Sequence, residues 1–313
     1  MKALLLTIAG SLLLMSLLVT VKFLLEDRLA PTDVGIHGVL QLQRVDLLLV
    51  GSSHTRQGYD ARLLESLTGA SAFIVAYNGL DPVGMVPVVR AILSNPQRHP
   101  KLLVIEANCV RLSHLPDVED PRLFFDSPPA IKAQLIDDYL RTHHYDRDSY
   151  VDVFSLIVNR GNDAIATWPF LHRIMSNLSY HGGYMGKNMP GLDPAAFSKL
   201  RVPIDGERPN PEQIAALHMI IELAKMNHVA VVLVDTPAPA PVEAQPVIAA
   251  MQQEWQHLAA VEAVPYARGI DGFSNTDPAL FSDSSHLSTA GRTLYTRLFA
   301  ESLPALQGAK ARP

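Results

Sequence analysis

Four short, largely apolar runs recur along the chain, and each is followed directly by glycine or a polar residue. The runs cover residues 45–50, 72–77, 102–105 and 229–234. Runs of this length without regular polar alternation are typical of strands buried on both faces of a parallel sheet. We therefore predict four such strands.

Helical patterns lie between these runs, at residues 61–67, 86–93 and 211–226. In the last of them, apolar side chains recur at helical spacing on one face: Ile214, Leu217, Ile221 and Ala224. Strands that alternate with helices indicate an α/β fold, in which crossover helices connect a parallel sheet. The Pro- and Ala-rich stretch 237–246 is predicted to be a loop within this domain.

Residues 113–200 break the alternation. The segment is rich in His, Tyr, Asp and Arg, with helical patterns near 131–142 and 151–159 and a turn-like sequence at 180–184. It is too long for a simple loop in a compact domain. We predict a helical insert that covers the sheet, within one domain spanning residues 45–313.

The N-terminus is dominated by an uncharged, Leu-rich stretch at residues 3–21. It is long enough to cross a bilayer as a helix. A cleaved signal peptide is the competing interpretation, but Arg28 lies where a cleavage site before Ala30 needs a small residue. We expect an uncleaved signal anchor over residues 1–25, followed by a connector over 26–44.

The charges on the two sides of the apolar stretch favour opposite orientations of the anchor. Lys2 favours an N-terminus inside the cytoplasm, whereas Lys22 and Arg28 lie on the other flank. We expect a single-pass anchor in the inner, cytoplasmic membrane with the remaining chain outside the cytoplasm, in the periplasm. Cys109 is the single cysteine, so no intrachain disulfide can form.

Composition excludes several classes of function. The 313 residues carry a formal net charge of −5 and no run of basic residues, which argues against a nucleic-acid partner. The sequence has neither a glycine-rich phosphate loop with lysine nor a dinucleotide fingerprint. His143, His144 and His181 lack the spacing of a metal site. We therefore expect no metal and no cofactor.

A serine turn follows the first predicted strand, in the sequence Gly51-Ser52-Ser53-His54. Ligands of parallel α/β sheets bind at the carboxyl ends of the strands. A serine there can present its hydroxyl above the sheet while its own N–H faces the same space, so a nucleophile and an oxyanion donor can coexist. Taken alone, such a turn is also an ordinary loop.

A second polar group lies near the C-terminus, where Asp283 precedes His286 by three residues. An aspartate at this spacing can orient the imidazole, which would act as general base toward serine. The alternative is a helix cap, in which Ser288 or Thr289 caps the final helix and Asp283 favours its start. Together with Ser53, the residues give the order Ser…Asp…His of one type of catalytic triad.

The two motifs resemble those of the SGNH (GDSL-type) hydrolase superfamily. The first family block is Gly-Asp-Ser, so Ser53 matches the nucleophile and Ser52 replaces the usual Asp. The resemblance implies the catalytic triad Ser53, Asp283 and His286. It also implies a flavodoxin-like three-layer α/β/α sandwich, over about residues 45–112 and 211–305.

The same resemblance implies an oxyanion hole formed by Ser53, Gly79 and Asn108. Gly79 follows the second predicted strand, as the glycine of the second block does. Gly84 is the second candidate for the same backbone donor. Asn108 matches the asparagine of the third block, Gly-x-Asn-Asp, although the chain here has Glu106-Ala-Asn-Cys.

A serine in place of the block's Asp resembles the membrane-anchored branch that modifies envelope polymers, including polysaccharide O-acetylation and D-alanyl transfer proteins. This implies an extracytoplasmic O-acetyltransferase that forms an acyl-enzyme on Ser53, acts on a polysaccharide and receives acyl groups from a multi-spanning membrane partner. Arg56, His181 and Tyr184 are candidate substrate-binding residues. Two alternatives stay open: a membrane-tethered esterase or deacetylase, and a non-catalytic scaffold, which the altered third block favours.

Overall fold

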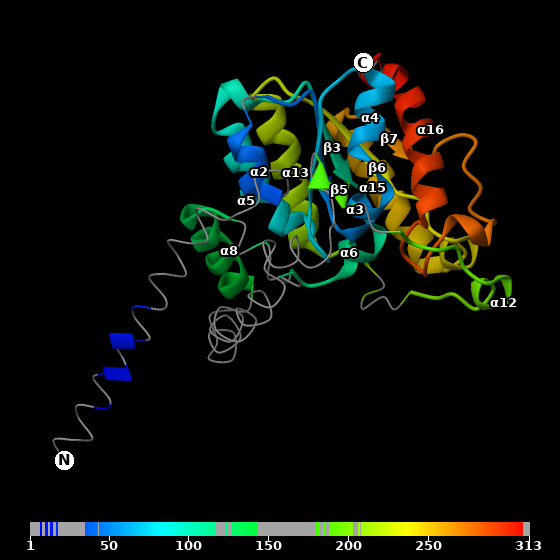
Figure 1. Ribbon diagram of the computed structural model, residues 1–313, viewed down its shortest axis with the longest axis horizontal. Coiled ribbons are helices and arrows are strands. Elements are labelled where there is room, and N and C mark those ends of the chain that lie inside the picture. The colour runs from blue at the N-terminus through cyan, green and yellow to red at the C-terminus, as the bar shows by residue number, and fades with distance from the viewer. Residues whose placement is uncertain are drawn as a thin grey trace.

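The computed structural model in Figure 1 describes most of the chain from residue 35 onward, and the N-terminus at single positions only. The described residues are 35–42, 44–116, 120, 123, 127–142, 180–181, 184–185, 188–202, 206 and 208–308, with single positions between 7 and 17. The helix predicted at 151–159, His143 and His144 lie outside the described residues.

The core of the domain is a five-stranded sheet in the order β2-β1-β3-β6-β7, with every neighbouring pair parallel. The strands are β1 (Leu47–Gly51), β2 (Ala72–Ala76), β3 (Leu102–Glu106), β6 (Ala230–Asp235) and β7 (Tyr266–Arg268). This is the doubly wound order of flavodoxin-like folds, and the predicted parallel α/β arrangement is confirmed.

The strand β1, which lies between β2 and β3, is buried at all of its positions, which explains its lack of polar alternation. Leu48 and Val50 point into one hydrophobic cluster, whereas Leu47 and Leu49 point into the other. The two clusters lie on opposite faces of the sheet, since successive strand residues alternate between faces. Each fully buried leucine contributes about 1.5–3 kcal/mol to folding.

Helices cover both faces of the sheet and complete the three layers (Figure 1). One layer contains α2 (Gly35–Gln41), α5 (Pro82–Leu93), α13 (Pro211–Met226) and α15 (Pro246–Glu262). The other layer contains α4 (Ala61–Thr68) and α16 (Thr289–Gly308). The helix α13 has the predicted bounds, and α5 begins four residues early because Asp81 caps it, accepting the N–H of Gly84 at 2.8 Å.

The remaining described elements lie in the connections between these strands and helices. They are α3 (Ser53–Gly58), η1 (Pro96–Arg98), α6 (Cys109–Ser113), α8 (Pro129–Thr142), α12 (Pro194–Phe197), α14 (Ala240–Glu243), η2 (Pro278–Leu280) and the antiparallel pair β4 (Tyr180–His181) and β5 (Tyr184–Met185).

The described part of the insert is not entirely helical. Its helix α8 packs against the first layer, where Ile131 and Leu135 are buried in the core cluster. The strands β4 and β5 form a small hairpin, and β5 lies beside α3. At the end of the insert, the N–H of Leu192 donates to the carbonyl oxygen of Pro278 at 3.0 Å. The insert is therefore attached to the domain at two places, through α8 on the first helical layer and through Leu192 beside η2.

The prediction of a loop at 237–246 is wrong in part. The stretch contains α14, and its last residue begins α15. Proline fixes the backbone dihedral φ near its helical value and needs no N–H partner in the first turn of a helix, so Pro241 and Pro246 fit the first turns of α14 and α15.

Among the described residues, no helix is long and apolar enough to cross a membrane. Residues 1–34 are described at single positions only, so the anchor expected there stays a prediction.

Candidate active site

The structure brings Ser53, His286 and Asp283 into one hydrogen-bonded chain. Nε2 of His286 lies 2.8 Å from Oγ of Ser53, although the two residues are 233 positions apart. Nδ1 of His286 lies 2.8 Å from Oδ2 of Asp283 and 3.0 Å from Oδ1. With the Nδ1 proton on the carboxylate side, Nε2 is free to accept the serine proton.

The loop before α16 holds the histidine. Oδ1 of Asp283 accepts the backbone N–H groups of Ser285 at 2.7 Å and His286 at 2.9 Å. Burial opposes ionisation of this carboxyl, but its hydrogen bonds from the imidazole and the two backbone groups hold its pKa below the usual value. Asp283 is therefore an anion that fixes the ring from the same turn.

The capping alternative is also realised, by Ser288, one of the two residues predicted for it. Oγ of Ser288 accepts the N–H of Gly291 at 3.0 Å and donates to the carbonyl oxygen of Ala279 at 2.6 Å. Ser288 thus caps α16, while the carboxylate of Asp283 is used for His286.

The serine side of the site is the turn from β1 into α3. Oγ of Ser52 caps α3 by accepting the N–H of His54 at 3.2 Å. Ser53 is the first residue of α3, so its own N–H has no acceptor within the helix. This N–H is available to a developing oxyanion at the same residue that supplies the hydroxyl.

Glu106, at the end of β3, organises this turn from behind. Its Oε2 accepts the N–H of Ser52 at 2.6 Å, and the N–H and hydroxyl of Thr55 at 3.0 and 2.5 Å. Its Oε1 accepts the hydroxyl of Ser52 at 2.6 Å and the side-chain amide of Asn108 at 2.9 Å. Only 3% of the surface of Glu106 is exposed, so protein donors take the place of water around its carboxylate.

This network explains why residue 51 is a glycine. A Cβ at that position would overlap the side chains of Glu106 and Thr55. It also explains the charge of Glu106. Burial raises the pKa of this carboxyl, but the hydrogen bonds from Ser52 and Thr55 outweigh that effect and hold the pKa below its usual value.

Gly79 lies in the turn that follows β2, where its φ is 62°, a left-handed conformation that favours glycine. It lines the same pocket as Ser53 and His286. Gly84 is excluded as the second candidate, because its N–H lies inside α5 and is bonded to Asp81. Gly79 is therefore the glycine whose backbone N–H is the candidate donor to an oxyanion.

Asn108 also lines the pocket, but its amide has partners. Its Oδ1 caps α6 by accepting the N–H groups of Val110 at 3.0 Å and Arg111 at 3.2 Å. Its Nδ2 donates to Glu106 at 2.9 Å and to Oγ of Ser52 at 3.3 Å. The longer bond to Ser52 is the one that an oxyanion could replace.

A pocket of about 320 Å³ opens over Ser53 and His286. Its walls include the guanidinium-bearing residues Arg56 and Arg111 and the ring of His54. The ring centroids of His54 and His286 are 5.5 Å apart in an edge-to-face contact. Burial lowers the pKa of His54 to about 4, so this ring is neutral at pH 7.

The other two candidate substrate-binding residues are placed only by their backbones. His181 lies in β4 and Tyr184 in β5, and their side chains are outside the described residues. Within the part of the chain that the structure describes, no group of three or more His, Cys, Asp or Glu side chains could hold a metal ion.

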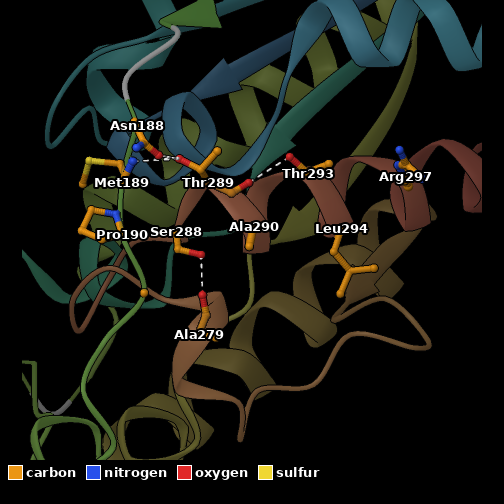
Figure 2. Close-up of a pocket in the computed structure, with 11 residues that line it drawn as sticks. Asn188, Met189, Pro190, Ala279, Ser288, Thr289, Ala290, Thr293, Leu294 and Arg297 are labelled. Carbon is orange, nitrogen blue, oxygen red and sulfur yellow. Dashed lines mark hydrogen bonds between the residues drawn. The ribbon is translucent and has the colours of Figure 1, made fainter.

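A separate, open groove of about 610 Å³ runs along the first turns of α16 (Figure 2). The segment around Met189 forms one wall, with its N–H donating to Oγ1 of Thr289 at 2.7 Å. No residue of the triad lines the groove. These contacts fix the end of the insert beside the loop that carries His286.

Sequence reasoning missed Glu106 and Asp235 as parts of the site. Both are the last residues of buried strands, and acidic residues directly after apolar runs were the signal for them. Asp235 accepts the side-chain amide of Gln252 at 3.1 Å, and burial raises its pKa to about 7. With His54 and Glu106 it lines a small cavity of about 30 Å³ behind the active-site pocket.

No protein-family model matches the chain, and no curated protein matches it. Among solved structures, it is similar to a protein assigned as an acylhydrolase from Bacteroides fragilis, at 14% identity and a TM-score of 0.40 over 85% of this chain and 89% of that one. It is also similar to a GDSL-like lipase from Bacteroides thetaiotaomicron, at 12% identity and a TM-score of 0.39 over 84% and 88% of the two chains. A third likeness is to TesA, at 16% identity and a TM-score of 0.39 over 84% and 99%. Likenesses at this level identify neither a family nor an activity.

Proposed function

We propose that the protein is a serine acyltransferase of the cell envelope, which acetylates hydroxyl groups of an exported polysaccharide through an acyl-enzyme on Ser53. The observation that supports it is the hydrogen-bonded chain from Ser53 through His286 to Asp283, which opens into a pocket. A hydroxyl activated in this way is the nucleophile of acyl transfer.

In the first half-reaction, Oγ of Ser53 attacks the ester carbonyl while Nε2 of His286 takes the serine proton. The oxyanion is stabilised by the N–H groups of Ser53 and Gly79. The imidazolium is stabilised by the carboxylate of Asp283 and returns its proton to the leaving alkoxide. In the second half-reaction, His286 takes the proton of the acceptor hydroxyl, which attacks the acyl carbon, and Ser53 regains its proton.

The envelope setting rests on sequence. The apolar stretch 3–21 would hold the enzyme at the membrane with its catalytic domain in the periplasm, and the Gly51-Ser52-Ser53 motif resembles that of envelope O-acetylation proteins. A multi-spanning membrane protein would then supply the acyl group. Protease added to spheroplasts should digest the domain and leave a short N-terminal fragment; full protection would contradict this placement.

The nucleophile is tested with a fluorophosphonate probe on the full-length protein. Wild type and the control Ser66→Ala, an exposed serine of α4, should be labelled, whereas Ser53→Ala should not. Absence of labelling in the wild type would instead favour a non-catalytic scaffold that binds polysaccharide or a membrane partner.

Transfer and hydrolysis are separated with 4-nitrophenyl acetate as acyl donor, in the presence and absence of a glycan acceptor. Acetyl groups recovered on the glycan support the transferase. Release of acetate at a rate that the acceptor does not change would replace it by a membrane-tethered esterase or deacetylase, which uses the same triad with water as acceptor.

A further inference from the structure

The ring of His54 is in contact with the catalytic imidazole. The centroids of the His54 and His286 rings are 5.5 Å apart and their planes are inclined by 71°, so the two rings pack edge to face. Aromatic pairs prefer this arrangement over flat stacking. His54 directly follows Ser53 in the first turn of α3. The segment that carries the nucleophile therefore also carries a ring that touches the base.

The position of His54 is fixed from behind. Its backbone N–H donates to Oγ of Ser52 at 3.2 Å, and that hydroxyl donates to the buried carboxylate of Glu106 at 2.6 Å. The side chain of His54 lines both the active-site pocket and the small cavity behind that pocket. It therefore forms part of the wall between the two spaces, on the side where His286 lies.

The charge of His54 suits a place beside the catalytic base. Burial is the main cause that lowers its pKa, to about 4. Among the charged groups that act on this ring, Glu106 and Asp283 raise the pKa, whereas His286 and Arg111 lower it. The ring of His54 is neutral at pH 7, so it does not repel the imidazolium that forms on His286 during acyl transfer.

The acyl-enzyme is the stage at which His286 has the fewest contacts. In the free enzyme its imidazole has a partner at each nitrogen, Ser53 at 2.8 Å from Nε2 and Asp283 at 2.8 Å from Nδ1. Once Oγ of Ser53 is bonded to the acyl carbon, it has no proton to donate, and the bond at Nε2 is lost. Asp283 then holds one side of the ring, and its own side chain is 48% exposed.

We propose that His54 is a positioning residue, which keeps the imidazole of His286 in place while Ser53 carries the acyl group. In this half-reaction, Nε2 of His286 takes the proton of the acceptor hydroxyl, and the acceptor oxygen bonds to the acyl carbon. The bond from that carbon to Oγ of Ser53 then breaks, and Oγ takes the proton back. The inference rests on the acyl-enzyme of the proposed function, and it applies to a glycan hydroxyl and to water alike.

Turnover of 4-nitrophenyl acetate by the full-length protein separates the two half-reactions. The value of kcat/KM reports acylation, and the ratio of acetylated to free Ser53 at saturating ester, measured by intact mass spectrometry of quenched samples, reports acylation relative to deacylation. In His54→Ala this ratio should rise by about three- to tenfold, the rate effect of losing one aromatic pair, while kcat/KM changes by less. An unchanged ratio, or a fall in kcat/KM at least as large as the rise in the ratio, would overturn the inference.

Other variants at this position separate the ring from its nitrogens and from its volume. His54→Phe keeps an aromatic ring without a nitrogen and should restore the ratio nearly to the wild-type value. Failure to restore it would show that a nitrogen of His54 is needed and would overturn the positioning role. His54→Leu keeps a side chain of similar size without the ring and should raise the ratio, which tests the inference even if His54→Ala does not fold. The control His257→Ala removes an exposed imidazole of α15 and should match wild type.

A measurement without turnover separates this inference from the proposed function. In Ser53→Ala, Nε2 of His286 has lost its partner, as in the acyl-enzyme. NMR of histidine-labelled, full-length Ser53→Ala should show one sharp set of ring signals for His286, whereas Ser53→Ala/His54→Ala should show broadened or multiple signals. Equally sharp signals in both would overturn the inference, whether or not Ser53 is a nucleophile. If the signals differ as expected but fluorophosphonate does not label wild-type Ser53, the proposed catalysis fails and the role of His54 in holding His286 stands.

Discussion

Oε2 of Glu106 accepts the backbone N–H of Ser52 at 2.6 Å, so a buried carboxylate lies directly behind the turn that presents Ser53. The same carboxylate binds Thr55 one helical turn on and the amide of Asn108. The position of Ser53 is therefore defined by a residue of the neighbouring strand as well as by its own strand. The acid of this network comes from β3, the strand beside the one that leads into the turn.

Replacing Glu106 by glutamine should weaken both folding and the nucleophile. The amide nitrogen cannot accept hydrogen bonds, so at least one buried donor of Ser52 or Thr55 loses its partner, at a cost of about 1–3 kcal/mol in the free energy of unfolding. The rate of fluorophosphonate labelling of Ser53 should fall as well. Urea denaturation and labelling kinetics measure the two effects. Glu254→Gln, at an exposed position of α15, is the matched control and should change neither. Wild-type stability and labelling in Glu106→Gln would contradict the role given to the network.

Replacing Asp283 by asparagine should reduce catalysis with little loss of stability. The side chain of Asp283 is 48% exposed, and its main contact is with His286. Without the carboxylate, the imidazole loses the group that fixes its tautomer and stabilises its protonated form, and kcat should fall by about 10³–10⁴-fold. Steady-state kinetics with 4-nitrophenyl acetate measure this. Asp277→Asn is a close control, because Asp277 also accepts a backbone N–H two residues on, at 2.9 Å from Ala279, without contacting a histidine. A fall of less than tenfold in Asp283→Asn would remove Asp283 from the triad.

The strands and the triad were accessible from sequence because both depend on local patterns. Four largely buried strands appear as apolar runs, and the observed bounds differ from the predicted ones by at most two residues. The strand β7 was not predicted, since Tyr266–Arg268 is short and only partly buried. The role of Glu106 could not be predicted, because it depends on the register that sets β3 beside β1 and on the missing Cβ of Gly51.

Asp235 should make stability depend on pH in a defined direction. Burial raises its pKa to about 7, above the value of about 4 in the unfolded chain. Between these values the folded state keeps a proton that the unfolded state has lost, so stability falls as pH rises from about 4 to 7 and then levels off. His54 has the opposite effect over nearly the same range, since its pKa of about 4 lies below the unfolded value of 6.5 and charging it destabilises the fold.

For this reason the contribution of Asp235 is measured as a difference between wild type and Asp235→Asn. As pH rises from 5 to 8, the variant should gain stability, and hence melting temperature, relative to wild type by at most about 3 kcal/mol, because about two pH units of this range lie below the folded-state pKa of about 7. Differential scanning fluorimetry across this range gives the comparison. Asp271→Asn, which makes the same substitution at an exposed position, is the control. A pH-independent difference for Asp235→Asn would show that the carboxyl of Asp235 titrates normally.

Asn108 has two separable roles, as the cap of α6 and as a donor at the pocket. Serine can replace the cap by accepting a backbone N–H, but it cannot supply the amide donors to Glu106 and to an oxyanion. Asn108→Ser should therefore keep the cap but lose the bond to Glu106, so the free energy of unfolding should fall by about 1–3 kcal/mol, and kcat should fall by about 10²-fold or more, the effect of losing one oxyanion donor. Asn108→Ala should lose about 1 kcal/mol of stability in addition. The control is Asn210→Ser, which makes the same change at the cap of α13, where Oδ1 accepts the N–H of Glu212 at 2.8 Å. If kcat in Asn108→Ser stays at the wild-type value, the oxyanion hole consists of the N–H groups of Ser53 and Gly79 without Asn108.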